Sequence, residues 1–122
     1  MSIVVKRVYD LASPDDGYRV LVDRLWPRGL SHARARLDLW LRDVAPSTAL
    51  RTWYGHRVER WPEFQKRYTK ELEEHPDLLD RVLELEREHQ RVSLLFAARD
   101  REHNEAQVLA AVLLRRQLAL HQ

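Results

Sequence analysis

The 122-residue sequence contains no cysteine at all. That absence excludes disulfide bonds, a thiolate nucleophile, and zinc or iron–sulfur sites that use cysteine ligands. Glycine is also scarce, with three residues in all, and no glycine-rich phosphate-binding loop occurs. The chain therefore lacks the signatures of thiol enzymes and of proteins that hold nucleotides in such a loop.

Long apolar runs and a strong charge imbalance are missing as well. No stretch approaches the roughly 20 apolar residues of a membrane helix. The sequence also does not show the positively charged segment followed by an apolar core that is typical of a signal peptide. The net charge is only +2: residues 1–60 carry 11 basic and 7 acidic side chains, and residues 61–122 carry 10 and 12. We therefore expect a cytoplasmic protein without a membrane partner. The weak basic character disfavours nucleic-acid binding.

What is present fits one globular α/β domain over residues 1–122, because 44% of the residues are hydrophobic. Hydrophobic patterning predicts strands at 3–8, 18–25 and 92–98, and a strand or extended segment at 37–44. It predicts a short helical turn at 31–35 and helices at 47–55, 59–74, 77–89 and 103–120. We expect a three-layer-like arrangement, in which a sheet of about four strands is flanked by helices. Whether the first two strands pair as a hairpin stays open.

The most unusual stretch is 18–29, YRVLVDRLWPRG, in which an apolar strand changes at once into a polar cluster. This cluster contains Asp23, Arg24, Trp26 and Arg28. Similar clusters follow the next two strand-like segments, and they consist of Asp43, Ser47, Arg51 and His56, and of Arg99, Asp100, His103 and Asn104. Ligands bind beyond the carboxyl ends of strands in open α/β sheets. If the strands are parallel neighbours, the three clusters meet in one cleft.

Each cluster has a functional and a structural interpretation. Asp23 and His103 are the catalytic candidates, since a histidine near neutrality suits acid–base work. The ligand-binding candidates are Arg24, Trp26, Arg28, Asp43, Ser47, Arg51, His56, Asp100 and Asn104. The arginines suit bidentate contact with a phosphate or carboxylate, and they equally suit a structural network with the aspartates.

The other candidates carry structural alternatives too. Ser47 is a natural helix cap, His103 and Asn104 could cap the last helix, and the tryptophans could fill the core. Oxygen and nitrogen ligands for a metal exist in principle, but no HExxH-like spacing supports a metal site. We expect neither a metal nor a cofactor.

Several motifs together resemble a known family. They are VKRVYD at 5–10, YRVLVDRLWPRGLS at 18–31, LDLWLRDVAPSTALRTWYGH at 37–56, WxxFxxRYxxEL at 61–72 and LLFAARDxEHNxA at 94–106. With them the chain resembles the YeaO-like family, domain of unknown function 488. The resemblance implies a small α/β fold whose strand ends gather polar motifs, and it implies no particular activity. Longer relatives place a cysteine after the strand that corresponds to 93–97, so their thiol chemistry does not transfer to this chain.

Two functions remain open from the sequence. The first is a protein or small enzyme that binds an anionic small molecule in a pocket of arginine, aspartate and histidine. The second is a non-catalytic module that binds a partner, as a homodimer for instance, through the aromatic segment 37–68.

Overall fold

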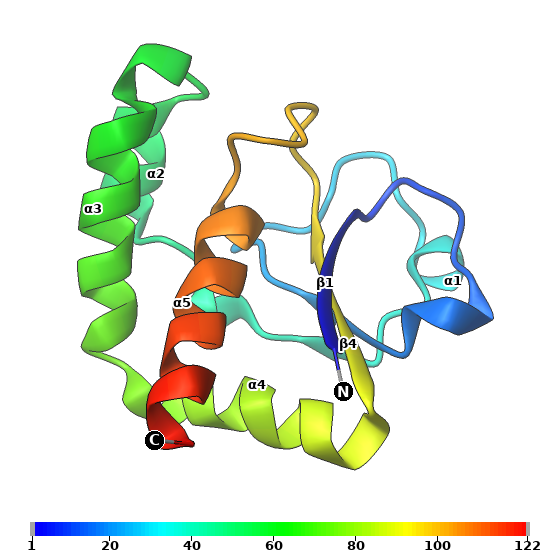
Figure 1. Ribbon diagram of the computed structural model, residues 1–122. Coiled ribbons are helices and arrows are strands. Elements are labelled where there is room, and N and C mark those ends of the chain that lie inside the picture. The colour runs from blue at the N-terminus through cyan, green and yellow to red at the C-terminus, as the bar shows by residue number, and fades with distance from the viewer. Residues whose placement is uncertain (1, 122) are drawn as a thin grey trace.

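The computed structural model describes residues 2–121, which fold around a four-stranded parallel sheet (Figure 1). The strands are β1 (Ser2–Arg7), β2 (Tyr18–Leu21), β3 (Leu39–Trp40) and β4 (Arg91–Phe96), in the order β1-β4-β2-β3. The small α/β fold expected from the sequence is confirmed. The hairpin alternative is wrong, because β4 lies between β1 and β2 and pairs with both.

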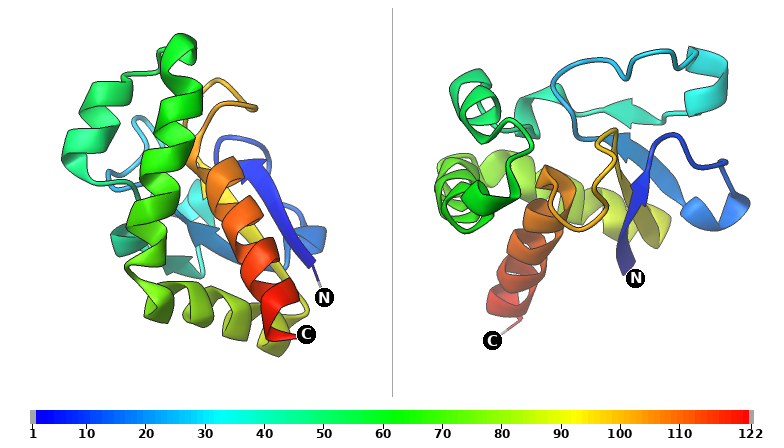
Figure 2. Two further views of the ribbon diagram at one scale, coloured as in Figure 1. Left: turned by 60° about the vertical axis from the view of Figure 1, so that its left-hand side comes forward. Right: turned by 90° about the horizontal axis from the view of Figure 1, so that it is seen from above.

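Within residues 2–121, five α-helices surround this sheet. They are α1 (His32–Ala35), α2 (Thr48–Tyr54), α3 (Trp61–Glu73), α4 (Pro76–His89) and α5 (Glu105–Leu120). Figure 2 shows α1 on the opposite side of the sheet from α5. None of the helices in residues 2–121 is long and apolar enough to cross a bilayer.

Strand β4 is buried on both faces, as its continuous apolar run predicts. Val92, Leu94 and Phe96 belong to the large core cluster that also takes in residues of α2, α3, α4 and α5. Leu95 points the other way, into a smaller cluster with residues of β2 and α1. Side chains alternate along a strand, so one short segment supplies both cores.

Two predicted strands are much shorter than expected, and the one predicted at 92–98 ends at Phe96. The segment 18–25 is a strand only as far as Leu21, although the Val22 N–H still donates to the Leu95 carbonyl at 3.0 Å. One residue later the Asp23 carboxylate accepts from the Ala97 N–H at 3.1 Å, so a side chain takes the place of the backbone ladder. In the segment 37–44 only Leu39–Trp40 is a strand, and Arg42–Val44 forms a 3₁₀ turn.

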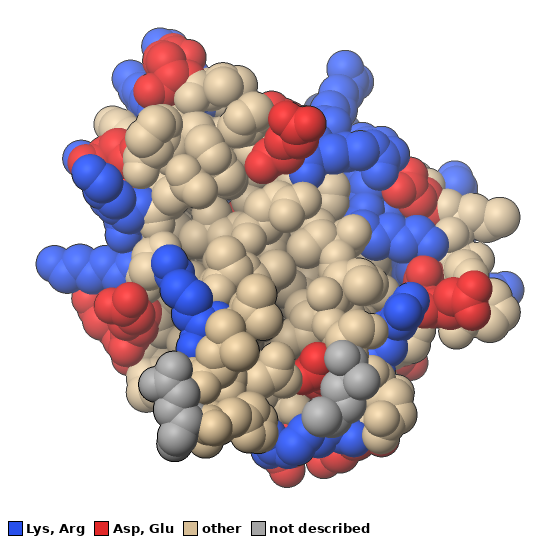
Figure 3. All heavy atoms as spheres, in the orientation of Figure 1, with Lys and Arg blue, Asp and Glu red and all other residues tan. Residues whose placement is uncertain are grey.

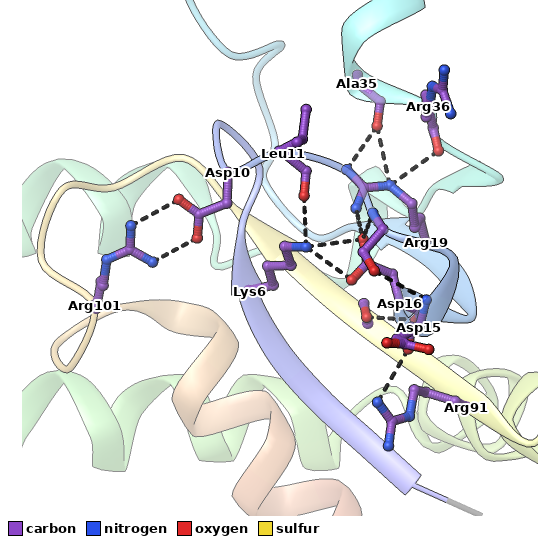
Figure 4. Close-up of polar contacts among 12 residues, drawn as sticks. Lys6, Asp10, Leu11, Asp15, Asp16, Arg19, Ala35, Arg36, Arg91 and Arg101 are labelled. Atoms are coloured by element: carbon purple, nitrogen blue, oxygen red, sulfur yellow. Dashed lines mark hydrogen bonds and ion pairs between the residues drawn. The ribbon is translucent and has the colours of Figure 1, made fainter.

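A buried group of ion pairs around Asp16 connects the turn before β2 to the sheet (Figure 4). Asp16 is 6% exposed and pairs with Lys6 at 2.9 Å and with Arg19. The Arg19 guanidinium also donates to the carbonyls of Ala35 and Arg36. Burial opposes ionisation of Asp16, but hydrogen bonds from Lys6, from the Ser13 N–H and from Arg19 outweigh it and lower the pKa of Asp16.

Candidate functional site

A cleft of about 1030 Å³ opens at the carboxyl-terminal end of the sheet. Its walls come from the ends of β1 and β2, from α2, and from the loop between β4 and α5. In Figure 3 basic side chains gather where β1 ends and where the loop after β4 runs. The cleft therefore lies where a parallel sheet is expected to bind ligands.

The structure brings most of the predicted site residues together in this cleft. The candidates that line it are Asp23, Arg24, Trp26, Arg28, Arg51, His56, Asp100, His103 and Asn104. Two candidates lie elsewhere: Asp43 is exposed in the 3₁₀ turn before α2, and Ser47 does not line the cleft. Ser47 instead caps α2 by accepting from the Leu50 N–H, and its hydroxyl donates to Glu71 at 2.6 Å.

Two of the cleft arginines, one at the end of β1 and one after β2, are held in place by backbone carbonyls. Arg7 donates from Nε to the Ala98 carbonyl at 3.0 Å, and its guanidinium lies 4.6 Å from the centre of the Tyr9 ring. Arg24 donates from Nε to the Pro46 carbonyl and from Nη2 to the Ala45 carbonyl, both at 3.2 Å. These bonds leave other N–H groups of each guanidinium unused.

Three further arginines line the cleft as exposed side chains, namely Arg28, Arg51 and Arg99. Within residues 2–121, none of the five cleft arginines forms an ion pair. The lining also holds three carboxyl groups, from Asp23, Asp100 and Glu105. Positive charge therefore exceeds negative charge in the cleft, five groups to three.

Asp23 and Glu105 form a carboxyl pair in the cleft. Asp23 Oδ2 accepts from the Ala97 N–H, whereas the buried Oδ1 has no partner in the described chain while both acids are ionised. Burial raises the pKa of Glu105 well above its usual range, and the hydrogen-bonded carboxyl of Asp23 raises it further. A proton on Glu105 would give the Asp23 carboxyl, whose Oδ1 has no partner, a hydrogen-bond donor.

Asp100 and His103 form a second polar pair on the loop before α5. His103 Nδ1 lies 2.8 Å from Asp100 Oδ2, and the His103 ring meets Trp61 edge to face. Hydrogen bonds from the Glu102 N–H and from His103 hold the pKa of Asp100 below its usual range. The carboxylate thus orients the imidazole and leaves Nε2 as its free nitrogen.

Some candidates in the cleft also have a clear structural task. Asn104 caps α5, since its Oδ1 accepts from the Gln107 N–H at 3.2 Å. The Trp26 indole donates to the Leu30 carbonyl at 2.7 Å and stacks on His32. The aromatic side chains of 37–68 are all buried or half-buried in the monomer, so a homodimer through them stays a prediction.

Sequence reasoning missed Arg7, Tyr9 and Glu105 as cleft residues. Arg7 and Tyr9 follow the first predicted strand, so the rule applied to the other strand ends would have found them. Glu105 gives no comparable signal, because an acid in the first helical turn is ordinary. No group of three or more metal-ligating side chains occurs among the described residues.

Comparison with known proteins gives a consistent result. Residues 2–121 match a family model described as "Inactive DUF488-N3 subclade". The chain is 41% identical to "Uncharacterized protein YeaO" of Escherichia coli (strain K12), over 90% of this chain and 95% of that protein. It is 54% identical to "Uncharacterized protein Rv3073c" of Mycobacterium tuberculosis (strain ATCC 25618 / H37Rv), over 56% of this chain and 58% of that one. No solved structure matches the chain.

Proposed function

The chain belongs to the YeaO-like DUF488 family, and on that premise we propose that its cleft binds a small cytoplasmic anion without transforming it. One observation carries the proposal: five arginines line a single cleft, and none of them is paired with an acid of the described chain. The word "inactive" in the description of the matching family model supports binding over catalysis.

The two anchored arginines suit this task best. A guanidinium that is already fixed by a backbone carbonyl loses little side-chain freedom when a ligand arrives, and this strengthens binding. Arg7 and Arg24 are both fixed in this way in the same cleft. A phosphate or carboxylate between them would accept charge-assisted hydrogen bonds from both.

Replacing Arg24 with glutamine tests the proposal directly. We expect the affinity for inorganic phosphate or pyrophosphate, measured by isothermal titration calorimetry, to fall about tenfold, because a charge-assisted hydrogen bond is lost. Arg81→Gln is the matched control, since Arg81 is exposed on α4 and does not line the cleft.

A second variant guards against a purely structural effect at Arg24, which also holds the carbonyls of Ala45 and Pro46. Arg28 is exposed and makes no side-chain hydrogen bond within residues 2–121, so Arg28→Gln leaves the cleft walls intact. The proposal fails if the wild-type protein binds neither probe, or if Arg24→Gln and Arg28→Gln both bind like Arg81→Gln.

A small enzyme is the second candidate, and the contact between Asp100 and His103 is what favours it. An imidazole oriented by a carboxylate is a common general base. For this candidate we expect slow phosphate release from some member of a panel of phosphate monoesters, and its loss in His103→Gln. No release from any ester contradicts catalysis and leaves binding as the function. Release that persists in His103→Gln contradicts a catalytic role for the Asp100–His103 contact.

A further inference from the structure

We infer that Asp23 and Glu105 hold one proton between them and that this proton controls the affinity of the cleft for its anion. The inference rests on the proposed function, because it concerns how the same cleft is regulated. It begins from two geometric observations: the buried Asp23 Oδ1 has no hydrogen-bond donor in residues 2–121, and Asp23 and Glu105 line the same cleft. The Asp23 carboxyl also helps to raise the pKa of Glu105, which identifies Glu105 as its partner.

The pair lies at a joint between two elements. Asp23 directly follows the end of the β2 pairing, and its other oxygen, Oδ2, holds the Ala97 N–H just beyond β4. Glu105 is the first residue of α5. A proton between the two carboxyls thus links the end of β2 to both ends of the loop 97–104.

The charged and titratable groups that face the pair come from several elements. They are Arg7 on β1, Arg24 after β2, Tyr54 on α2, His56 after α2, Tyr68 on α3, and Asp100 and His103 on the loop before α5. Two of these side chains, His56 and His103, are imidazoles, a group whose ordinary pKa lies near neutrality. Any test must therefore separate Glu105 from both histidines.

Loss of the shared proton weakens anion binding in two ways. It adds a second negative charge to the cleft, so five arginines then face three carboxylates instead of two. It also makes Asp23 and Glu105 repel each other, which weakens the hold of Asp23 on Ala97. The same loop carries Arg99 and the Ala98 carbonyl that anchors Arg7. When the loop shifts, these two arginines lose their alignment toward the anion.

Thermodynamic linkage gives the sign of the effect. An anion in the cleft favours the protonated pair, so binding takes up a proton and the affinity falls as pH rises through the titration of Glu105. Protonation of His103 would act in the same direction, since a cationic imidazole also attracts the anion. The two contributions are separated by substitution.

Sulfate is the appropriate probe, because its own charge does not change over the range studied. We measure sulfate affinity by calorimetry from about pH 5 to about pH 9 in wild type, Glu105→Gln, His103→Gln and His56→Gln. The wild-type affinity is expected to fall about tenfold or more across the range. Glu105→Gln keeps the neutral shape of the protonated acid, so its affinity is expected to stay high at alkaline pH. His103→Gln and His56→Gln are each expected to retain most of the wild-type fall.

Proton uptake on binding provides an independent readout. Titrations in two buffers of different ionisation enthalpy are expected to show uptake in the wild type and much less in Glu105→Gln. The inference is overturned if Glu105→Gln follows the wild-type pH profile, or if His103→Gln or His56→Gln alone abolishes it.

Failure of the inference can be told apart from failure of the proposed function. If sulfate binds at no pH, the anion site itself is wrong. The shared proton is then tested through stability. Because its folded pKa is raised, Glu105 is expected to lower the free energy of unfolding as pH rises above the ordinary glutamate pKa, and Glu105→Gln to remove this loss. Identical pH profiles of stability in the two proteins would rule out the shared proton as well.

Discussion

Replacing Asp16 with asparagine is expected to lower the free energy of unfolding by about 3 kcal/mol or more. The variant keeps the shape of the side chain but leaves the buried guanidinium of Arg19 and the ammonium group of Lys6 without their anion. A buried ion pair is costly to break from one side, because the remaining charge cannot regain water. Urea denaturation with an unchanged m-value is the measurement.

Asp80→Asn is the matched control for this experiment. It removes an ion pair of similar geometry, in which Arg116 donates to both Asp80 oxygens at 2.7 and 3.0 Å, but the Asp80 side chain is 53% exposed. An exposed pair contributes roughly 0–1 kcal/mol. Equal losses in the two variants would contradict a special role for burial at Asp16.

The pH dependence follows from the lowered pKa of Asp16. A carboxyl whose folded pKa lies below its unfolded value stabilises the protein above the unfolded pKa, and it loses this contribution as pH falls through the folded pKa. The difference between wild type and Asp16→Asn is therefore expected to shrink in acid.

Gly17→Ala is the second substitution with a large expected effect. Gly17 has φ of 66° and ψ of −140°, and a Cβ atom there would lie 2.4 Å from the Arg91 carbonyl oxygen. Backbone strain and a clash with another backbone add together, and we expect a loss of about 3 kcal/mol, or a fall in Tm of roughly 10 °C.

Gly29→Ala separates the clash from the strain. Gly29 also has a positive φ, 74°, but no atom lies within 4 Å of a Cβ built there. We expect this substitution to cost only about 1 kcal/mol, from the backbone conformation alone. A comparable fall in Tm for both variants would show that the approach of Gly17 to Arg91 is not tight in solution.

The parts of the fold that were predictable depend on local patterns. The strand predicted at 92–98 was confirmed as β4, Arg91–Phe96, and so were the caps Ser31 and Ser47 and the stop at Gly55, because each depends on neighbouring residues alone. The pairing of β1 and β2 with β4 was not predictable, because contacts over such sequence separation leave no trace in periodicity.

The candidate site divides in the same way. Asp23, Arg24 and Arg28 follow a strand and reach the cleft, as the strand-end rule predicts. Asp43 follows a segment that is mostly not a strand, so the rule had no basis there. Glu105 was missed because its role depends on the burial of a carboxyl beside Asp23, and burial is a property of the assembled fold.

The central position of β4 also constrains the order in which the protein can be made. Ser2 pairs with Arg91 and Tyr18 with Val92, so β1 has no partner, and β2 has only the two-residue β3, until the ribosome has added some 70 residues beyond Leu21. At ordinary rates of synthesis this takes several seconds. Throughout that time the apolar N-terminal segment is exposed on the nascent chain, and high contact order makes the later closure slow. During synthesis this small domain therefore passes through a stage in which it can aggregate. That stage ends when β4 is made and pairs with β1 and β2.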